Sequence, residues 1–206
     1  TALDLLHGAG LHESDLRNTP DLPLMEPYRT EWIAAGRQAT SLAQNCSGKH
    51  AAMLATCAVN DWPLTTYLNR GHPCQQAVIE TTRGFGQNVV WTSIDGCGAP
   101  AYAISLVGLA RIFGVLAAAT DGAEKQVADA MRSHPELVGG TGRDVTDLMR
   151  GVPGMIAKDG AEGVYAAGLP DGRGIAIKIM DGGIRARPVV MGAALPFFYR
   201  PMQGTE

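Results

Sequence analysis

Residues 155–190 have the sequence MIAKDGAEGVYAAGLPDGRGIAIKIMDGGIRARPVV, in which apolar side chains alternate with others, as they do in β-strands. The turn sequences PDG and DGG interrupt the alternation. Ile175, Ile177 and Ile179 share one face, because successive side chains of a strand point to opposite sides. The pattern predicts an antiparallel meander of four strands at Met155–Lys158, Gly163–Leu169, Gly174–Met180 and Ile184–Val190.

The segments before this meander favour helices. Apolar residues recur at helical spacing from about Lys49 to Val59, behind Ser47 as the predicted N-cap. Further helices are predicted at Pro73–Thr82, at Ala101–Ala119 after Pro100, and from a capping box of Asp121 and Glu124 to Met131. The β-branched and aromatic run Val89–Ile94 predicts a buried strand. Helices that cover an antiparallel sheet correspond to the α+β fold class.

Composition limits the classes of function. A chain of 206 residues with 46% hydrophobic residues fits a single domain over residues 1–206. A formal net charge of -3 provides no general attraction for nucleic acid or for an anionic membrane surface. Arg111 lies near the middle of the longest apolar stretch, where it would cost about 2.5–3.5 kcal/mol in a bilayer. We therefore expect neither a nucleic-acid partner nor a membrane span.

Two of the four cysteines stand beside glycine in turn-like sequences. Cys46 precedes the helix that begins near Lys49, and Cys97 precedes Pro100, so both are expected near helix N-termini, where the thiolate is favoured. Thiolates bind zinc or attack carbonyl carbons, although each cysteine can equally be a small core residue. Cys57 and Cys74 are expected to be structural. Four cysteines are too few for a disulfide scaffold, which favours a reducing, cytoplasmic location.

Two polar residues beside these cysteines are further candidates. Asp95 ends the predicted strand, where its carboxylate can orient a ligand amine or a metal ligand, or merely bond its own turn. His50 lies in the first turn of its helix and can line a pocket or pack in the core. The common zinc patterns C-x-x-C and H-E-x-x-H are absent, so spacing alone does not predict a metal.

Four motifs in the same order resemble the bacterial L-asparaginase II family, the Rhizobium-type, thermolabile and zinc-containing asparaginases. The motifs are Asn45-Cys-Ser-Gly-Lys-His50, Asp95-Gly-Cys-Gly-Ala-Pro100, His134-Pro-Glu-Leu-Val-Gly-Gly-Thr-Gly-Arg143 and Ala157-Lys-Asp-Gly-Ala-Glu-Gly-Val-Tyr165. The resemblance implies a fold similar to serine β-lactamases and glutaminases, a homodimer, and hydrolysis of L-asparagine to L-aspartate and ammonia.

The resemblance also implies roles for individual residues. A zinc ion would be held by Cys46, Lys49 and Cys97, and the lysine must be neutral to serve as a ligand. The residues implied for substrate binding and catalysis are Asp95 at the substrate's amino group, Thr141 in the substrate site, and Lys158 as a catalytic lysine in K-x-G-A-E-G. His50 is a further candidate for substrate binding from its place in the first turn of its helix. Asp159 stands where the family often has a hydroxyl residue, which adds negative charge near that lysine.

The nucleophile of the family is a serine in an S-x-x-K arrangement, where lysine takes the hydroxyl proton. This sequence has no S-x-x-K, because Ser47-Gly48-Lys49 is one residue too short. The resemblance therefore implies that the serine lies in a segment preceding Thr1. Three alternatives stay open. One is a metal-free amidohydrolase with Cys97 as nucleophile and Asp95 or His50 assisting, another is a truncated module that binds zinc or an amino acid, and the weakest is a β-lactam hydrolase.

Overall fold

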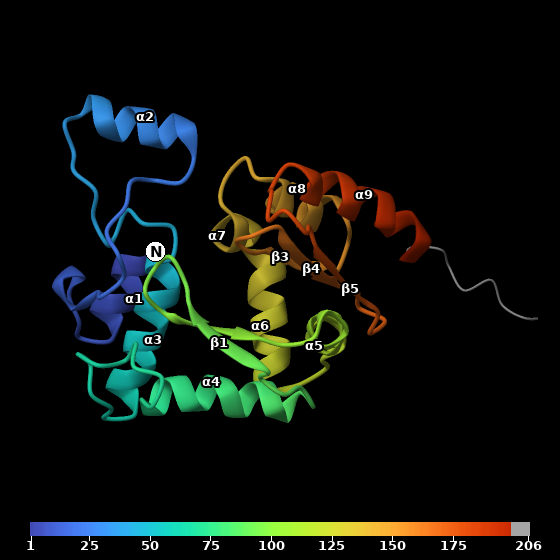
Figure 1. Ribbon diagram of the computed structural model, residues 1–206, viewed down its shortest axis with the longest axis horizontal. Coiled ribbons are helices and arrows are strands. Elements are labelled where there is room, and N and C mark those ends of the chain that lie inside the picture. Colours follow the sequence, from blue (N-terminus) through green and yellow to red (C-terminus); the bar gives the residue numbers. More distant parts are fainter. Residues whose placement is uncertain (199–206) are drawn as a thin grey trace, which may run out of the picture. The chain divides into compact units, whose positions relative to one another are not determined.

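The computed structural model describes residues 1–198, and the chain forms two compact units, Thr1–Ile104 and Ser105–Glu206. Each unit has its own small antiparallel sheet, and helices make up most of the rest (Figure 1). The predicted α+β class is therefore confirmed. The sequence predicted a single domain over residues 1–206, and this stays a prediction, because two compact units can belong to one domain or to two.

The first unit contains four α-helices, one short 3₁₀ helix and a β-hairpin among its described residues. In chain order these are α1 (Ala2–Gly8), the 3₁₀ turn Glu13–Asp15, α2 (Glu26–Ala34), α3 (Ser47–Val59), α4 (Pro73–Gly84), β1 (Trp91–Ile94) and β2 (Pro100–Ala103). The core forms where α1 packs on α3, around fully buried Leu6, Leu54 and Tyr67. In contrast, α2 buries none of its residues.

The hairpin of the first unit corrects two predictions. Pro100 begins β2 rather than a helix, because β2 pairs with β1 in antiparallel register, Ile94 opposite Pro100. Proline is tolerated at the first residue of an edge strand, where its missing N–H breaks no ladder. Nor is β1 a buried strand: Trp91 is 72% and Ile94 is 78% exposed. The apolar composition of this segment predicted the strand but not its environment.

The second unit contains a three-stranded sheet and five helices among its described residues. These are α5 (Leu106–Ala118), α6 (Gly122–Ser133), α7 (Pro135–Gly139), α8 (Asp144–Gly151), β3 (Ile156–Asp159), β4 (Val164–Gly168), β5 (Gly174–Lys178) and α9 (Ala186–Phe198). The sheet order β3-β4-β5 with antiparallel neighbours confirms the meander for three strands. The fourth strand, Ile184–Val190, is wrong, since α9 occupies that segment. Arg187 and Met191, four residues apart on one helix face, are its buried positions.

Helices cover both faces of this sheet (Figure 1). Alternate residues, among them Tyr165 and Ile175, pack with side chains of α8 and α9 in one cluster. The opposite face carries Ile156 and small residues against α5 and α6. At Gly168 and Gly174 any Cβ would collide with backbone carbonyls of α5, so glycine there allows the helix to lie directly on the strands.

The longest apolar stretch is therefore a helix that packs on a sheet. It begins at Leu106, after β2, and Ser105 caps it by accepting a hydrogen bond from the Gly108 N–H. Asp121 is the N-cap residue of α6 but its side chain makes no capping bond, so the predicted capping box does not form. Within residues 1–198 no single helix has the length and composition to cross a membrane; only the pair α5 and α6, bent by 88°, has both together.

Candidate functional site

Two turns of the first unit carry the candidate site. Cys46 is the N-cap residue of α3, which begins at Ser47, so Ser47 is not the cap that the sequence predicted. Cys97 lies in the turn between β1 and β2, where the Asp95 N–H donates to Ala99 O at 2.8 Å and the Gly98 N–H donates to Asp95 O at 2.8 Å. Gly98 has φ +87°, a conformation that favours glycine, which keeps this turn tight. The expectation that Cys97 precedes a helix is wrong.

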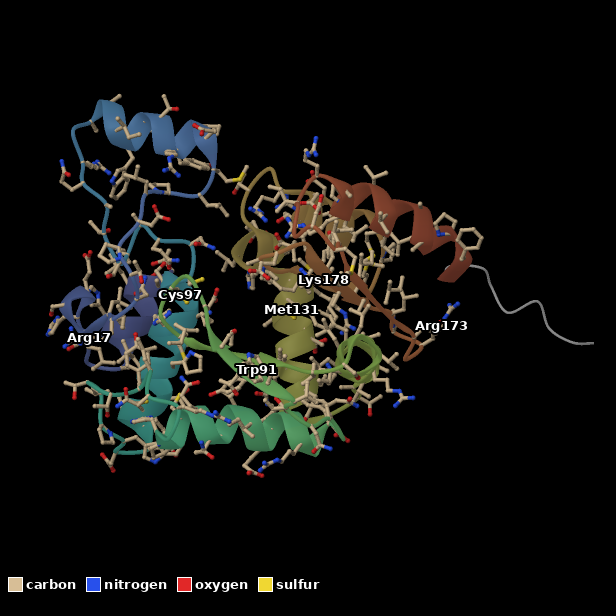
Figure 2. All side chains as sticks on the ribbon, in the orientation of Figure 1. Arg17, Trp91, Cys97, Met131, Arg173 and Lys178 are labelled. Carbon is tan, nitrogen blue, oxygen red and sulfur yellow. The ribbon has the colours of Figure 1, made fainter. Side chains whose placement is uncertain are left out.

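The structure brings the side chains of these two turns together. One ligand atom each of Cys46, Asp95 and Cys97 lies within 4.8 Å of the other two. The Cys97 thiol donates to Asp95 Oδ2 at 3.4 Å, and Lys49 Nζ donates to the same oxygen at 3.0 Å. Cys97, labelled in Figure 2, is buried, whereas Cys46 is only partly buried. We call these four residues the thiol cluster.

Burial and charge act against each other in the thiol cluster. Burial raises the pKa of the Cys46 thiol, and the charge of Lys49 opposes this only in part. Burial also acts to raise the pKa of Asp95, but its hydrogen bond to Lys49 and the lysine's charge outweigh it, so the net shift is downward. Burial acts to lower the pKa of Lys49, but its hydrogen bond to Asp95 and the charge interactions with Cys46 and Cys97 outweigh burial, so the net shift is upward. The cluster therefore contains an ion pair of Lys49 and Asp95 beside Cys46, whose raised pKa disfavours the thiolate that helix position alone suggested.

His50 is fully buried on α3. Its Nδ1 lies 2.7 Å from Tyr67 Oη, which also accepts a hydrogen bond from the Arg17 N–H at 3.1 Å. Burial, with the nearby charge of Lys49, lowers the pKa of His50 to about 4, so the ring is neutral near pH 7. A role for His50 in substrate binding stays a prediction.

The donor atoms of Cys46, Asp95 and Cys97 fit a zinc ion. Zinc binds thiolate sulfur at about 2.3 Å with tetrahedral geometry, which separates two sulfur ligands by about 3.8 Å. The 4.8 Å limit on the distances within the cluster leaves each side chain only a small movement from such a site. Soft sulfur ligands select zinc or copper(I) over magnesium or calcium. Cys57 and Cys74 are buried elsewhere in this unit, where burial raises the pKa of both thiols, that of Cys57 to about 12.

Lys158 and Thr141 belong to the second unit. Thr141 is exposed in the turn between α7 and α8. Lys158 is half-exposed on β3, and its Nζ donates to Asp159 O at 2.6 Å and to Asp159 Oδ1 at 2.7 Å. The carboxylate of Asp159 therefore binds the predicted catalytic lysine directly.

Two arginines that the sequence did not single out as site residues hold Asp159 in place. Arg143 and Arg187 donate to Asp159 Oδ2, the latter at 3.1 Å, and the carboxylate is buried. Burial acts to raise the pKa of Asp159, but Lys158 and the two guanidinium groups outweigh it and hold the pKa below its usual range. Arg143 was visible as the end of the third motif. Arg187 lay in a segment predicted as a strand, where no pattern directed it toward Asp159.

An α+β fold with two thiols, a carboxylate and a lysine in one cluster defines a protein with a candidate thiolate metal centre. The family described as L-asparaginase II matches residues 1–200, and the chain belongs to that family. This confirms the resemblance that the four motifs indicated, and it supports an asparaginase-type hydrolase activity with asparagine as the substrate. A comparison with curated proteins gives no match.

Proposed function

We propose that the protein hydrolyses L-asparagine to L-aspartate and ammonia by a serine and lysine mechanism, with a zinc ion assisting in substrate positioning. The observation that carries the metal part of this proposal is the thiol cluster, in which Cys46, Asp95 and Cys97 converge within 4.8 Å. The carboxylate of Asp95 distinguishes this pair of sulfurs from Cys57 and Cys74, which lie together in the apolar core of the same unit. We further propose the homodimer and the cytoplasmic location that the family resemblance and the free thiols favour.

The residues of the thiol cluster have different proposed roles, in binding zinc and in binding the substrate. Cys46, Cys97 and Lys49 are the proposed zinc ligands, and the bound ion would supply a fixed positive charge that orients a polar group of the substrate. Asp95 is proposed to hold the substrate's α-ammonium group. In the structure Asp95 Oδ2 accepts a hydrogen bond from the Lys49 ammonium group at 3.0 Å. If Lys49 became a neutral zinc ligand, this carboxylate would be released to bind the substrate's ammonium group instead.

Lys158 is the proposed catalytic lysine, which exchanges a proton with the reacting groups. Its ammonium group is half-exposed at the end of β3, so it is accessible to a ligand, and Asp159 fixes its position. The nucleophile of this proposal is a serine, and no residue of the printed sequence is assigned to that role. Thr141 and His50 are kept as proposed substrate-site residues.

A second candidate is a metal-free amidohydrolase with Cys97 as its nucleophile. The hydrogen bond from the Cys97 thiol to Asp95 Oδ2 at 3.4 Å favours it, because a nucleophilic thiol needs a nearby base to take its proton. Both candidates use the same two residues, but only the first requires that a metal ion be retained.

Replacing Cys97 or Cys46 by serine is expected to abolish zinc binding, because a hydroxyl is a far poorer zinc ligand than a thiolate. The measurement is zinc content per chain after desalting, with ammonia release assayed on the same samples of the full-length protein. Cys74→Ser is the matched control, since Cys74 is also buried in this unit and lies outside the cluster. It should retain the wild-type zinc content.

The outcomes separate the candidates. The thiol nucleophile would be supported if the wild-type protein holds no zinc and the Cys97→Ser variant no longer releases ammonia. Asparagine binding measured by calorimetry, without ammonia release from the full-length protein, would indicate a binding module.

A further inference from the structure

Two buried amide side chains stand directly behind the thiol cluster. Asn18 is 2% and Gln44 is 6% exposed, and the Asn18 Nδ2 donates to Gln44 Oε1 at 3.1 Å and to Ser41 O at 2.7 Å. Burying a polar amide costs free energy unless its hydrogen bonds are made. Two apolar side chains could therefore fill these positions equally well if the positions served only for packing. We call Asn18 and Gln44 the amide pair.

The amide pair binds the backbone of one cysteine directly. Gln44 Oε1 accepts the Cys46 N–H at 2.8 Å, while it also accepts the bond from Asn18. The other end of the same side chain, Nε2, donates to Asn45 Oδ1 at 3.1 Å. The oxygen and the nitrogen of the Gln44 amide are therefore both bonded to the residues just before α3, Cys46 and Asn45.

The residue after Asn18 binds the other cysteine. The Thr19 N–H donates to Cys97 O at 3.2 Å, so the chain at 18–19 is bonded to both turns of the thiol cluster. The Ser41 hydroxyl donates to Asn18 O at 2.6 Å, which holds this segment against the one that carries Gln44. The contacts form a continuous path from the Cys46 backbone, through Gln44 and Asn18, to the backbone of Cys97.

We propose that Gln44 and Asn18 are positioning residues of the metal centre, which hold the Cys46 and Cys97 turns at the separation that a shared metal ion requires. The inference rests on the zinc site proposed above. Groups behind the ligands commonly set ligand orientation, and their loss typically lowers metal affinity about 10–100-fold. Without these hydrogen bonds the turns that carry the ligands have more conformational entropy, and more of it is lost when the ion binds.

The test is the zinc affinity of Gln44→Leu, measured by competition with a chromophoric chelator. Leucine keeps the bulk of the side chain but removes both bonds to residues 45 and 46, so zinc affinity should fall about 10–100-fold. Gln75→Leu is the matched control. Gln75 is 2% exposed in the same unit, its Nε2 donates to Tyr67 O at 2.8 Å, and its Oε1 accepts from the Tyr102 hydroxyl at 3.0 Å, so these bonds involve neither Cys46 nor Cys97. The control should lose stability and keep its zinc affinity.

A conservative variant at position 44 tests the role of the hydrogen bond itself. Gln44→Glu keeps an acceptor oxygen for the Cys46 N–H and should recover most of the lost affinity, which a merely space-filling role would not predict. A folded Gln44→Leu protein that binds zinc as tightly as the wild type and Gln75→Leu would overturn the inference. If Gln44→Leu does not fold, Asn18→Ala decides by the same criterion. Wild-type protein without zinc affinity would instead overturn the proposed metal site itself.

Discussion

Lys158→Met is expected to lower ammonia release from the full-length protein by about 10²–10⁴-fold, the usual contribution of one positioned acid or base. Methionine keeps much of the apolar stem but cannot carry a proton. The ammonium group of Lys158 is held by two oxygens of Asp159 at 2.6 and 2.7 Å, so its loss removes a fixed proton carrier rather than a mobile surface charge. The measurement is kcat for ammonia release from L-asparagine at saturating substrate.

Lys178→Met provides the matched control for this prediction. Lys178 is also an exposed lysine of the same sheet, at the end of β5, and donates to Glu162 O. Its replacement should leave kcat unchanged, because Lys178 has no proposed contact with substrate. A Lys158→Met protein with wild-type kcat would exclude this lysine from the chemistry.

Asp159→Ala is expected to destabilise the protein by about 3–5 kcal/mol, as measured by chemical denaturation. The carboxylate is buried and binds Lys158, Arg143 and Arg187, so its loss leaves the buried charge of Arg187 without its main counter-ion. Asp171→Ala is the control, since Asp171 pairs with Arg173 on the surface of the same unit and should change stability far less. Equal effects of the two substitutions would show that the cluster around Asp159 adds no special stability.

The ion pairs of Asp159 with Lys158, Arg143 and Arg187 predict that the stability of the protein depends on pH. Because the pKa of Asp159 is lowered on folding, its contribution to the free energy of unfolding is complete above the unfolded value of about 3.9. It is lost as the pH falls through the lower, folded pKa. Acid titration of stability should therefore show a steeper loss in the wild type than in Asp159→Asn, which cannot titrate at this position.

Local patterns in the sequence predicted the elements that neighbouring residues determine. The alternation in residues 155–178 predicted three strands of the meander, and the spacing of apolar residues after Lys49 predicted α3. Pro100 shows where such patterns fail, because proline suits the first position of a helix and the start of an edge strand alike. Pairing with β1, a contact outside the local window, decided between them. Arg187 was missed for a similar reason, since its segment alternates like a strand and became a helix around two buried positions.

The candidate site was predictable in its residue types and not in its connections. Cys46, Lys49, Asp95 and Cys97 were all selected from the sequence, and the structure brings them together. The amide pair could not be selected, because Asn18 and Gln44 lie in a stretch without periodic pattern and their role depends on burial. The raised pKa of Cys46 was also beyond a local argument, since it comes from burial, which the charge of Lys49 offsets only in part.

The most direct test of the central claim is X-ray absorption at the zinc edge of wild-type protein loaded with one equivalent of zinc. A site built on Cys46 and Cys97 predicts two sulfur ligands at about 2.3 Å, with nitrogen or oxygen completing a tetrahedral shell. A spectrum with nitrogen and oxygen ligands alone, or protein that fails to retain the ion, would contradict the account.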